Sequence, residues 1–176
     1  MDKEQTKILE ALQYAIQMEI DGKEYYGKAS QKCEIKAGKE LFEWLAEQED
    51  WHRQKFEKIY KAIKDSKAWP NIDVEAGRQD KPITLFLQQA KVDTCDIKSS
   101  RSELNTIAKA MDMENKTHDF YREQGDVVVY EAQGKFYKAL AAEERKHYLA
   151  LVDYREYLID PEGWFRKVEH HSLDGG

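Results

Sequence analysis

Six side chains of this 176-residue chain follow one arrangement: a lone glutamate precedes, by 30 residues, a glutamate that stands three positions before a histidine. The arrangement occurs twice, as Glu19, Glu49 and His52 and again as Glu114, Glu144 and His147. A glutamate and a histidine three positions apart project from one face of a helix. Mixed carboxylate and imidazole ligands are typical of iron or manganese at redox sites, whereas structural zinc usually recruits thiolates. The pattern predicts a metal site built from six side chains.

The two sets belong to an internal repeat, because a shift of 95 residues aligns the chain with itself around all six positions. Only three prolines and nine glycines interrupt a sequence rich in strong helix formers. We expect helices at about 4–32, 37–65, 100–125 and 130–159, paired as two hairpins with short turns. The chain is therefore predicted to be all-α.

Between the hairpins, about 66–99 contains two prolines and reads as a long crossover. A helix of about 28 residues is about 42 Å long, and some 34 residues of extended chain can return along that length. This connection predicts a ferritin-like four-helix bundle over 1–160. The short extension 161–176 carries Trp164 and Phe165, and we expect it to dock on the bundle or on a partner subunit.

Each expected helix carries an apolar stripe at spacings of three and four residues, and each stripe is interrupted midway by the six polar side chains. Burying four carboxylates without compensation costs several kcal/mol each. No lysine or arginine lies on the stripes unless Lys23 is included. Two divalent ions would offset four carboxylates and leave both imidazoles neutral, so we expect two metal ions. Iron is favoured, and manganese is the alternative.

Three segments around these residues resemble the rubrerythrin branch of the ferritin-like di-iron carboxylate superfamily. They are 18–26 (MEIDGKEYY), 45–52 (LAEQEDWH) and 142–147 (AEERKH), within a resemblance that spans about 4–160. The resemblance implies that Glu49 and Glu144 bridge two irons. It further implies that Glu19 and His52 complete one iron site, and that Glu114 and His147 complete the other. The implied activity is reduction of peroxide or dioxygen.

Two departures from that family qualify the resemblance. The chain has only two cysteines, Cys33 and Cys95, so it lacks a rubredoxin domain and its electrons must come from an external donor such as a rubredoxin or a reductase. Positions 115–118, which include Thr117, hold no carboxylate, whereas rubrerythrins carry an extra glutamate on this helix. The six-ligand set is closer to bacterioferritin. A ferroxidase role in iron handling is thus the alternative function. A third alternative is a structural role, in which the metal ions only stabilise the bundle.

Several aromatic residues accompany the site. Tyr26 and Tyr121 lie seven residues after a lone glutamate on the same stripe, and could hydrogen-bond to bound carboxylates, although packing in the core is the favoured interpretation. Trp44 and Trp51 lie off the stripe of the second helix, which indicates burial under the crossover or a subunit contact. His118 is interpreted as a surface residue.

Composition narrows the function classes. A net charge of −6 with scattered lysine and arginine argues against nucleic acid as a partner. No run approaches the roughly 18–20 apolar residues of a transmembrane helix, and the polar start lacks a signal-peptide core. We expect a cytoplasmic protein without a membrane partner, and a homodimer.

Overall fold

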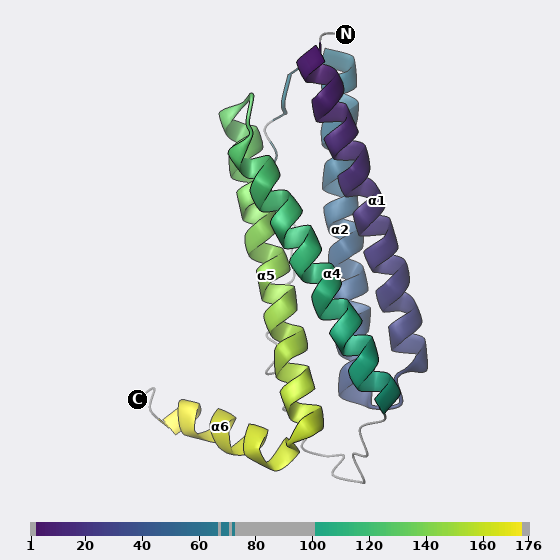
Figure 1. The fold of residues 1–176 in the computed structure, drawn as a ribbon, viewed down its shortest axis with the longest axis vertical. Coiled ribbons are helices and arrows are strands. Elements are labelled where there is room, and N and C mark those ends of the chain that lie inside the picture. Colours follow the sequence, from purple (N-terminus) through teal and green to yellow (C-terminus); the bar gives the residue numbers. More distant parts are fainter. Residues whose placement is uncertain (1–2, 67, 71, 73–100, 174–176) are drawn as a thin grey trace.

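The computed structural model describes residues 3–66, 68–70, 72 and 101–173, and all regular structure in these ranges is helical (Figure 1). The helices are α1 Lys3–Lys32, α2 Lys36–Ser66, α4 Arg101–Asp126, α5 Glu131–Ile159 and α6 Pro161–Leu173. The first four agree with the predicted helices to within one residue at each end. The prediction of an all-α, ferritin-like bundle is confirmed.

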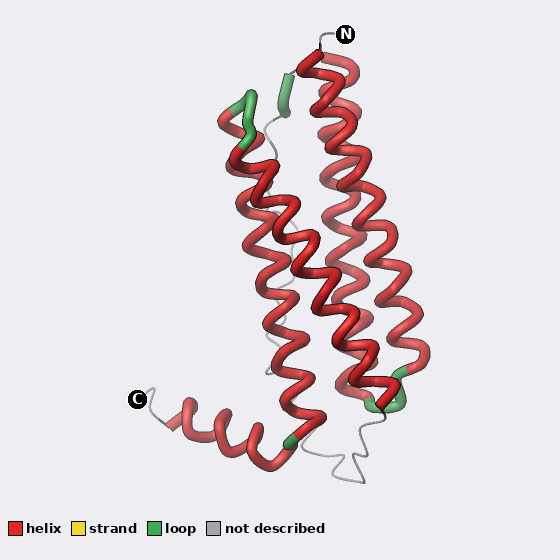
Figure 2. Tube along the Cα trace, in the orientation of Figure 1, coloured by secondary structure: helices red, strands yellow, loops and turns green. Residues whose placement is uncertain are grey.

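The four long helices form two antiparallel hairpins, α1 with α2 and α4 with α5, each closed by a short loop (Figures 1 and 2). Helix α2 ends beside the N-terminus, whereas α4 begins at the opposite end of the bundle (Figure 1). The chain must therefore return along the length of the bundle between them, as a ferritin-like topology requires. The crossover predicted at about 66–99 lies almost entirely outside the described residues.

Apolar side chains fill the bundle in two clusters that flank a polar middle layer. One cluster includes Phe42, Leu45 and Leu151, and the other includes Leu12 and Phe56, all at most 1% exposed. Burying each such side chain contributes about 1.5–3 kcal/mol relative to leaving it exposed. These clusters hold the four helices in register on both sides of the predicted ligands.

The C-terminal extension is helical, which the sequence analysis did not predict. Pro161 suits the first position of a helix because its missing N–H would have no partner there. Asp160 Oδ1 accepts a hydrogen bond from the Gly163 backbone N–H at 3.0 Å and so caps α6. Trp164 is buried against Tyr157, with ring centroids 5.8 Å apart. Beyond this contact α6 points away from the bundle (Figure 1).

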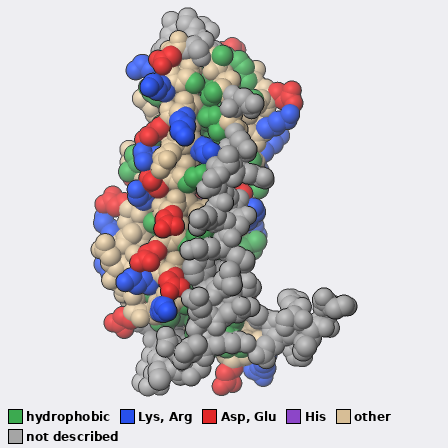
Figure 3. All heavy atoms as spheres, turned by 180° about the vertical axis from the view of Figure 1, so that it is seen from behind, with side chains coloured by type: hydrophobic (Ala, Val, Ile, Leu, Met, Phe, Trp, Pro, Cys, Tyr) green, Lys and Arg blue, Asp and Glu red, His purple; other side chains and the backbone are tan. Residues whose placement is uncertain are grey.

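Within the described ranges, no helix combines the length and the apolar content that crossing a bilayer would require. The face opposite to that of Figure 1 shows lysine and arginine side chains intermixed with acidic ones over the described surface (Figure 3).

Cys33 is a half-buried free thiol at the α1–α2 turn. Its Sγ lies 2.8 Å from Glu103 Oε1 and 3.6 Å from the Tyr154 hydroxyl, and Gly38 leaves the space that the Tyr154 ring needs. Burial, followed by the hydrogen bond to Glu103, raises the pKa of Cys33 to about 12.

The raised pKa predicts a thiol that reacts slowly, because the thiolate is the nucleophile. In a Cys95→Ser background, iodoacetamide should alkylate Cys33 at pH 8 at least about 100-fold more slowly than free cysteine. Glu103→Gln should speed this reaction, since it removes the carboxylate that disfavours the thiolate. Alkylation of Cys33 at the rate of free cysteine would contradict the prediction.

Candidate metal centre

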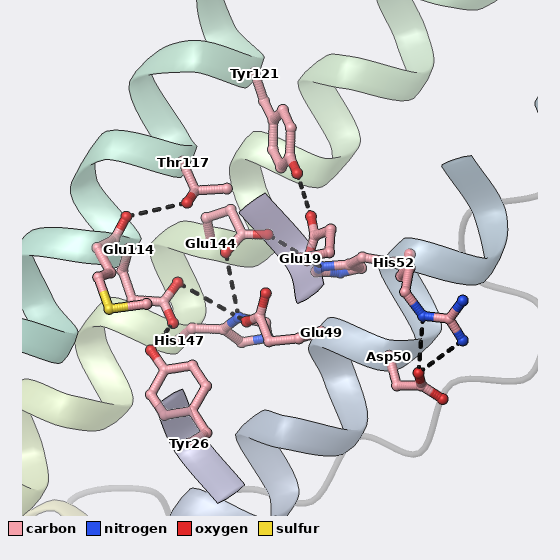
Figure 4. A network of polar contacts seen from close by, with 12 residues as sticks. Glu19, Tyr26, Glu49, Asp50, His52, Glu114, Thr117, Tyr121, Glu144 and His147 are labelled. Atoms are coloured by element: carbon pink, nitrogen blue, oxygen red, sulfur yellow. Dashed lines mark hydrogen bonds and ion pairs between the residues drawn. The ribbon is translucent and has the colours of Figure 1, made fainter. Parts of the chain in front are cut away.

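The six predicted ligands meet in the polar layer midway along the bundle (Figure 4). Helices α2 and α5 each supply a glutamate and a histidine, while α1 and α4 each supply one glutamate. None of the six is more than 4% exposed, so water does not screen their charges. All six residues that the sequence spacing predicted lie together in this layer: Glu19, Glu49, His52, Glu114, Glu144 and His147.

The six side chains form two overlapping groups, in each of which one ligand atom per residue lies within 4.8 Å of the others. One group is Glu19, Glu49, His52 and Glu144, and the second is Glu49, Glu114, Glu144 and His147. Glu49 and Glu144 belong to both. Each group offers three carboxylates and one imidazole, and could hold a metal ion.

A close approach between α1 and α2 makes room for one shared carboxylate. A Cβ atom at Gly22, which lies three residues after Glu19, would be 3.1 Å from Glu49 Oε2. That distance is tighter than ordinary van der Waals contact. The glycine therefore lets the Glu49 side chain lie between the helices.

Each imidazole turns Nδ1 toward one carboxylate of its own hairpin and one of the other hairpin. His52 Nδ1 lies 3.0 Å from Glu144 Oε1 and 3.5 Å from Glu19 Oε2. His147 Nδ1 lies 3.5 Å from Glu49 Oε1 and 3.6 Å from Glu114 Oε2. The rings of the two histidines are stacked, with centroids 5.6 Å apart. Two positively charged imidazoles would repel one another at this distance.

With the protein's own charges alone, the carboxyl groups of the cluster differ in ionisation. Burial raises the pKa of Glu49 well above its usual range, and Glu19 and Glu144 raise it further. Burial also raises the pKa of Glu114, with a contribution from Glu144. Burial acts in the same direction on Glu144, but His52 and His147 outweigh it and hold the pKa of Glu144 well below its usual range.

The negative charge of the carboxylates raises the pKa of both histidines. Burial acts to lower the pKa of His52, yet the carboxylates of Glu19 and Glu144 raise it to about 10. Burial opposes protonation of His147 as well, and Glu114, Glu144 and Glu49 raise its pKa. The cluster therefore takes up protons to offset its carboxylates. Divalent ions would offset them instead and would release those protons.

The donor set fits metal ions better than it fits protons. Eight buried nitrogen and oxygen atoms of the six side chains have no hydrogen-bond partner among the described residues. They include both carboxylate oxygens of Glu144, Nδ1 of His52 and both ring nitrogens of His147. Buried polar atoms are hydrogen-bonded in the great majority of cases. A group of such nitrogen and oxygen atoms without hydrogen bonds in one place indicates that metal coordination, rather than hydrogen bonding, satisfies them.

Two tyrosines attach the lone glutamates to the opposite hairpin (Figure 4). The Tyr26 hydroxyl donates to Glu114 Oε1, and the Tyr121 hydroxyl donates to Glu19 Oε1. Both rings are fully buried, so they pack in the core and bond to the cluster at once. Each tyrosine reaches the glutamate of the other half because α1 and α4 run antiparallel, which the spacing within one helix does not reveal.

The two tryptophans of α2 also border the cluster. The Trp44 and His147 rings meet edge to face at a centroid distance of 5.4 Å, and Trp51 lies 5.4 Å from the His52 ring. Trp44 is buried, whereas Trp51 is partly exposed beneath Lys55 Nζ. Neither contact was predicted. His118 is 26% exposed and contacts Asp119, so it lies outside the cluster.

Comparison with known proteins agrees with this geometry. The rubrerythrin family model matches residues 10–154, which include all six side chains of the cluster. The chain belongs to the rubrerythrin family. A solved structure of a hypothetical protein from Pyrococcus furiosus is 27% identical in sequence to this rubrerythrin-family chain, with a TM-score of 0.66. That similarity covers 88% of this chain and 92% of the other. No curated protein matches the chain.

Proposed function

We propose that this rubrerythrin-family chain is a non-haem di-iron oxidoreductase, which reduces peroxide or dioxygen with electrons from an external donor. The observation that carries the proposal is the pair of overlapping groups of buried ligand atoms, most of which have no hydrogen-bond partner among the described residues. A structural role for the metal ions would not require carboxylates shared between two sites. The lack of cysteine ligands in the cluster favours iron, with manganese as the alternative.

Each ion would have two ligands of its own and two ligands that it shares with the other ion. Glu19 and His52 would hold one ion, Glu114 and His147 would hold the other, and Glu49 and Glu144 would contact both. Membership of the two groups supports this assignment. When bound, a pair of Fe(II) ions supplies two electrons together, which is the number that reduction of a peroxide O–O bond consumes.

The chain's own residues set the conditions for that chemistry. Four carboxylates balance the charge of two divalent ions, which leaves the imidazoles neutral and free to bind through Nδ1. The hydroxyls of Tyr26 and Tyr121 hold Glu114 and Glu19 in place. Such outer partners typically change metal affinity or activity 10–100-fold when they are removed. Burial of all six side chains keeps bulk water away from the ions.

The first test is metal content followed by reactivity. Protein purified without added metal should contain iron or manganese, and anaerobic loading with Fe(II) should reach about two ions per chain, as the charge balance requires. In stopped-flow mixing, hydrogen peroxide should oxidise the iron-loaded protein faster than dioxygen does. Faster oxidation by dioxygen would contradict a peroxidase, and failure to bind iron or manganese stoichiometrically would contradict the site itself.

A ferroxidase role in iron handling is the second candidate, and one observation favours it. Thr117 stands one turn after Glu114 and donates to the Met113 carbonyl at 3.1 Å, so this turn offers no further carboxylate to the ions. The six-ligand set would then process Fe(II) as a substrate. Continuous dioxygen uptake with added Fe(II), in an assembly of many subunits, would favour this candidate. A particle of two subunits would exclude mineral storage.

A further inference from the structure

A line of redox-active rings leads from the cluster to the edge of the bundle. The Tyr121 hydroxyl donates to Glu19, and the Tyr121 ring lies 5.9 Å from that of Tyr137. The Tyr137 ring lies in turn 6.0 Å from Trp69, with both distances measured between centroids. Tyr121 and Tyr137 are at most 1% exposed, whereas Trp69 is only partly buried. The line therefore begins at a predicted metal ligand and ends at a ring that solvent can reach.

The other half of the repeat carries the same contact with one hydroxyl fewer. At the shift of 95 residues, Tyr26 corresponds to Tyr121, and Phe42 corresponds to Tyr137. Tyr26 bonds to Glu114 as Tyr121 bonds to Glu19, and its ring lies 6.2 Å from Phe42. A phenol can lose one electron under biological conditions, whereas a phenyl ring is far harder to oxidise. Between these two equivalent ring contacts, only the one with Tyr137 joins two oxidisable rings, although Tyr26 also contacts Tyr25 on its own helix at a centroid distance of 5.8 Å.

We propose that Tyr121, Tyr137 and Trp69 form a route for one-electron transfer between the cluster and the edge of the bundle, and that Phe42 interrupts the equivalent route in the other half. The use of this route depends on the proposed function, because an oxidising metal centre is what would draw electrons through it. The ability of the rings to pass an electron does not depend on that function.

The transfer balances with groups that are present or named. An oxidising equivalent at the cluster takes one electron from Tyr121, whose phenolic proton passes to Glu19 Oε1. An electron then passes through the Tyr137 ring to Tyr121, which recovers its proton from Glu19, and Tyr137 keeps its own phenolic proton. Trp69 supplies this electron and its indole N–H proton passes to water, so the radical ends on the Trp69 ring. A small thiol or another one-electron reductant in solution restores Trp69.

The route can be tested without iron, by running it in reverse in the full-length protein loaded with Zn(II), which has no redox chemistry of its own. Pulse radiolysis in azide solution generates the azide radical, which oxidises exposed tryptophan to its indolyl radical. The proposal expects a first-order step in which the indolyl absorption decays as the phenoxyl absorption of tyrosine rises. Its rate should not depend on protein concentration, because the transfer occurs within one chain.

Substitutions that keep an aromatic ring at each position then show which residues the electron transfer passes through. With Trp51 and Trp164 changed to phenylalanine in every sample, Trp69→Phe should abolish the step, and Tyr137→Phe should slow it by at least an order of magnitude. Tyr121→Phe should lower the final yield of phenoxyl radical. Tyr60→Phe is the matched control, because Tyr60 packs against the same apolar cluster without a ring contact in this line, and it should leave the rate unchanged. Zinc content and circular dichroism verify that each variant is folded and loaded.

An unchanged rate in Tyr137→Phe, or a step that survives Trp69→Phe, would overturn the route. These outcomes are independent of the proposed function, since no peroxide or iron takes part. If the transfer occurs but the iron-loaded protein ignores peroxide, the route stands and the proposed oxidoreductase activity fails. If peroxide is reduced but no transfer occurs, the electrons enter elsewhere.

Discussion

The substitution Glu49→Gln is expected to prevent loading of both metal ions while leaving the stability of the metal-free protein almost unchanged. Glu49 belongs to both ligand groups, so its loss affects both sites. We expect the metal affinity to fall at least about 100-fold, more than the loss of an outer hydrogen-bond partner causes. In metal-free protein, burial and the neighbouring carboxylates raise the pKa of Glu49 well above its usual range, which favours its neutral form. The substitution then puts a neutral amide of similar shape in place of a carboxyl group that favours its neutral form.

Glu144→Gln should also prevent loading, but it should destabilise the metal-free protein. The pKa of Glu144 is held low by the two histidines, so its carboxylate is charged and pairs with both imidazoles. Removing one partner of a buried charge pair typically costs about 3–5 kcal/mol. Glu47→Gln, at an exposed position of α2 two residues before Glu49, is the control for both variants and should change neither property.

Metal analysis after Fe(II) loading and urea denaturation of chelator-treated protein would measure the two effects. Equal stabilities for metal-free Glu49→Gln and Glu144→Gln would show that the shared glutamates do not differ in ionisation. Full metal loading of either variant would show that the substituted carboxylate is not a shared ligand.

The fold and the six clustered side chains were predictable because they depend on short-range sequence patterns, and these patterns occur in both halves of the internal repeat. Glu49 and His52 lie on the stripe that must face the core, and Glu144 and His147 occupy the same places in the second half. A carboxylate on such a stripe is conspicuous because burial makes it costly. The helix ends were predictable to one residue because the helical periodicity of apolar residues breaks at the short turns 33–35 and 127–130.

The contacts across the hairpins were not predictable in the same way. The bonds from Tyr26 to Glu114 and from Tyr121 to Glu19 depend on the axial register of α1 against α4, and no sequence spacing gives that register. The contact of Trp44 with His147 depends likewise on how α2 lies against α5. The helix α6 was not predictable from Pro161, because a proline there suits the end of the preceding helix as well as the start of a new one.

Removing the metal ions should reverse the way stability depends on pH. In metal-free protein the pKa of His52 is about 10, above its unfolded value of about 6.5. A protonated group with a raised pKa stabilises the fold fully below its unfolded pKa, and that contribution is lost as the pH rises through the folded pKa. The raised pKa values of Glu49 and Glu114 act in the same direction. Metal-free protein should therefore become less stable between about pH 6.5 and pH 10.

Metal-loaded protein should instead become more stable as the pH rises from about pH 5 to pH 8. Protons compete with metal ions for carboxylates and imidazoles, so metal affinity rises from about pH 5 to pH 8. Free metal at a thousand times its dissociation constant stabilises the folded state by about 4 kcal/mol per site. For a chain of this length that corresponds to a rise in Tm of about 8–16 °C per site.

Thermal unfolding of chelator-treated and Zn(II)-loaded protein across pH 5 to 10 would test both slopes in the same buffers. A loss of about 3 kcal/mol in the metal-free protein would lower its Tm by about 6–12 °C between neutral and alkaline pH. Because all six groups lie at the junction of the two hairpins, whatever neutralises them also holds the hairpins together. Protons can do so only where the imidazoles stay charged, whereas divalent ions can do so once the imidazoles are neutral. Parallel curves for the two samples would mean that the metal ions bind elsewhere than at these six side chains.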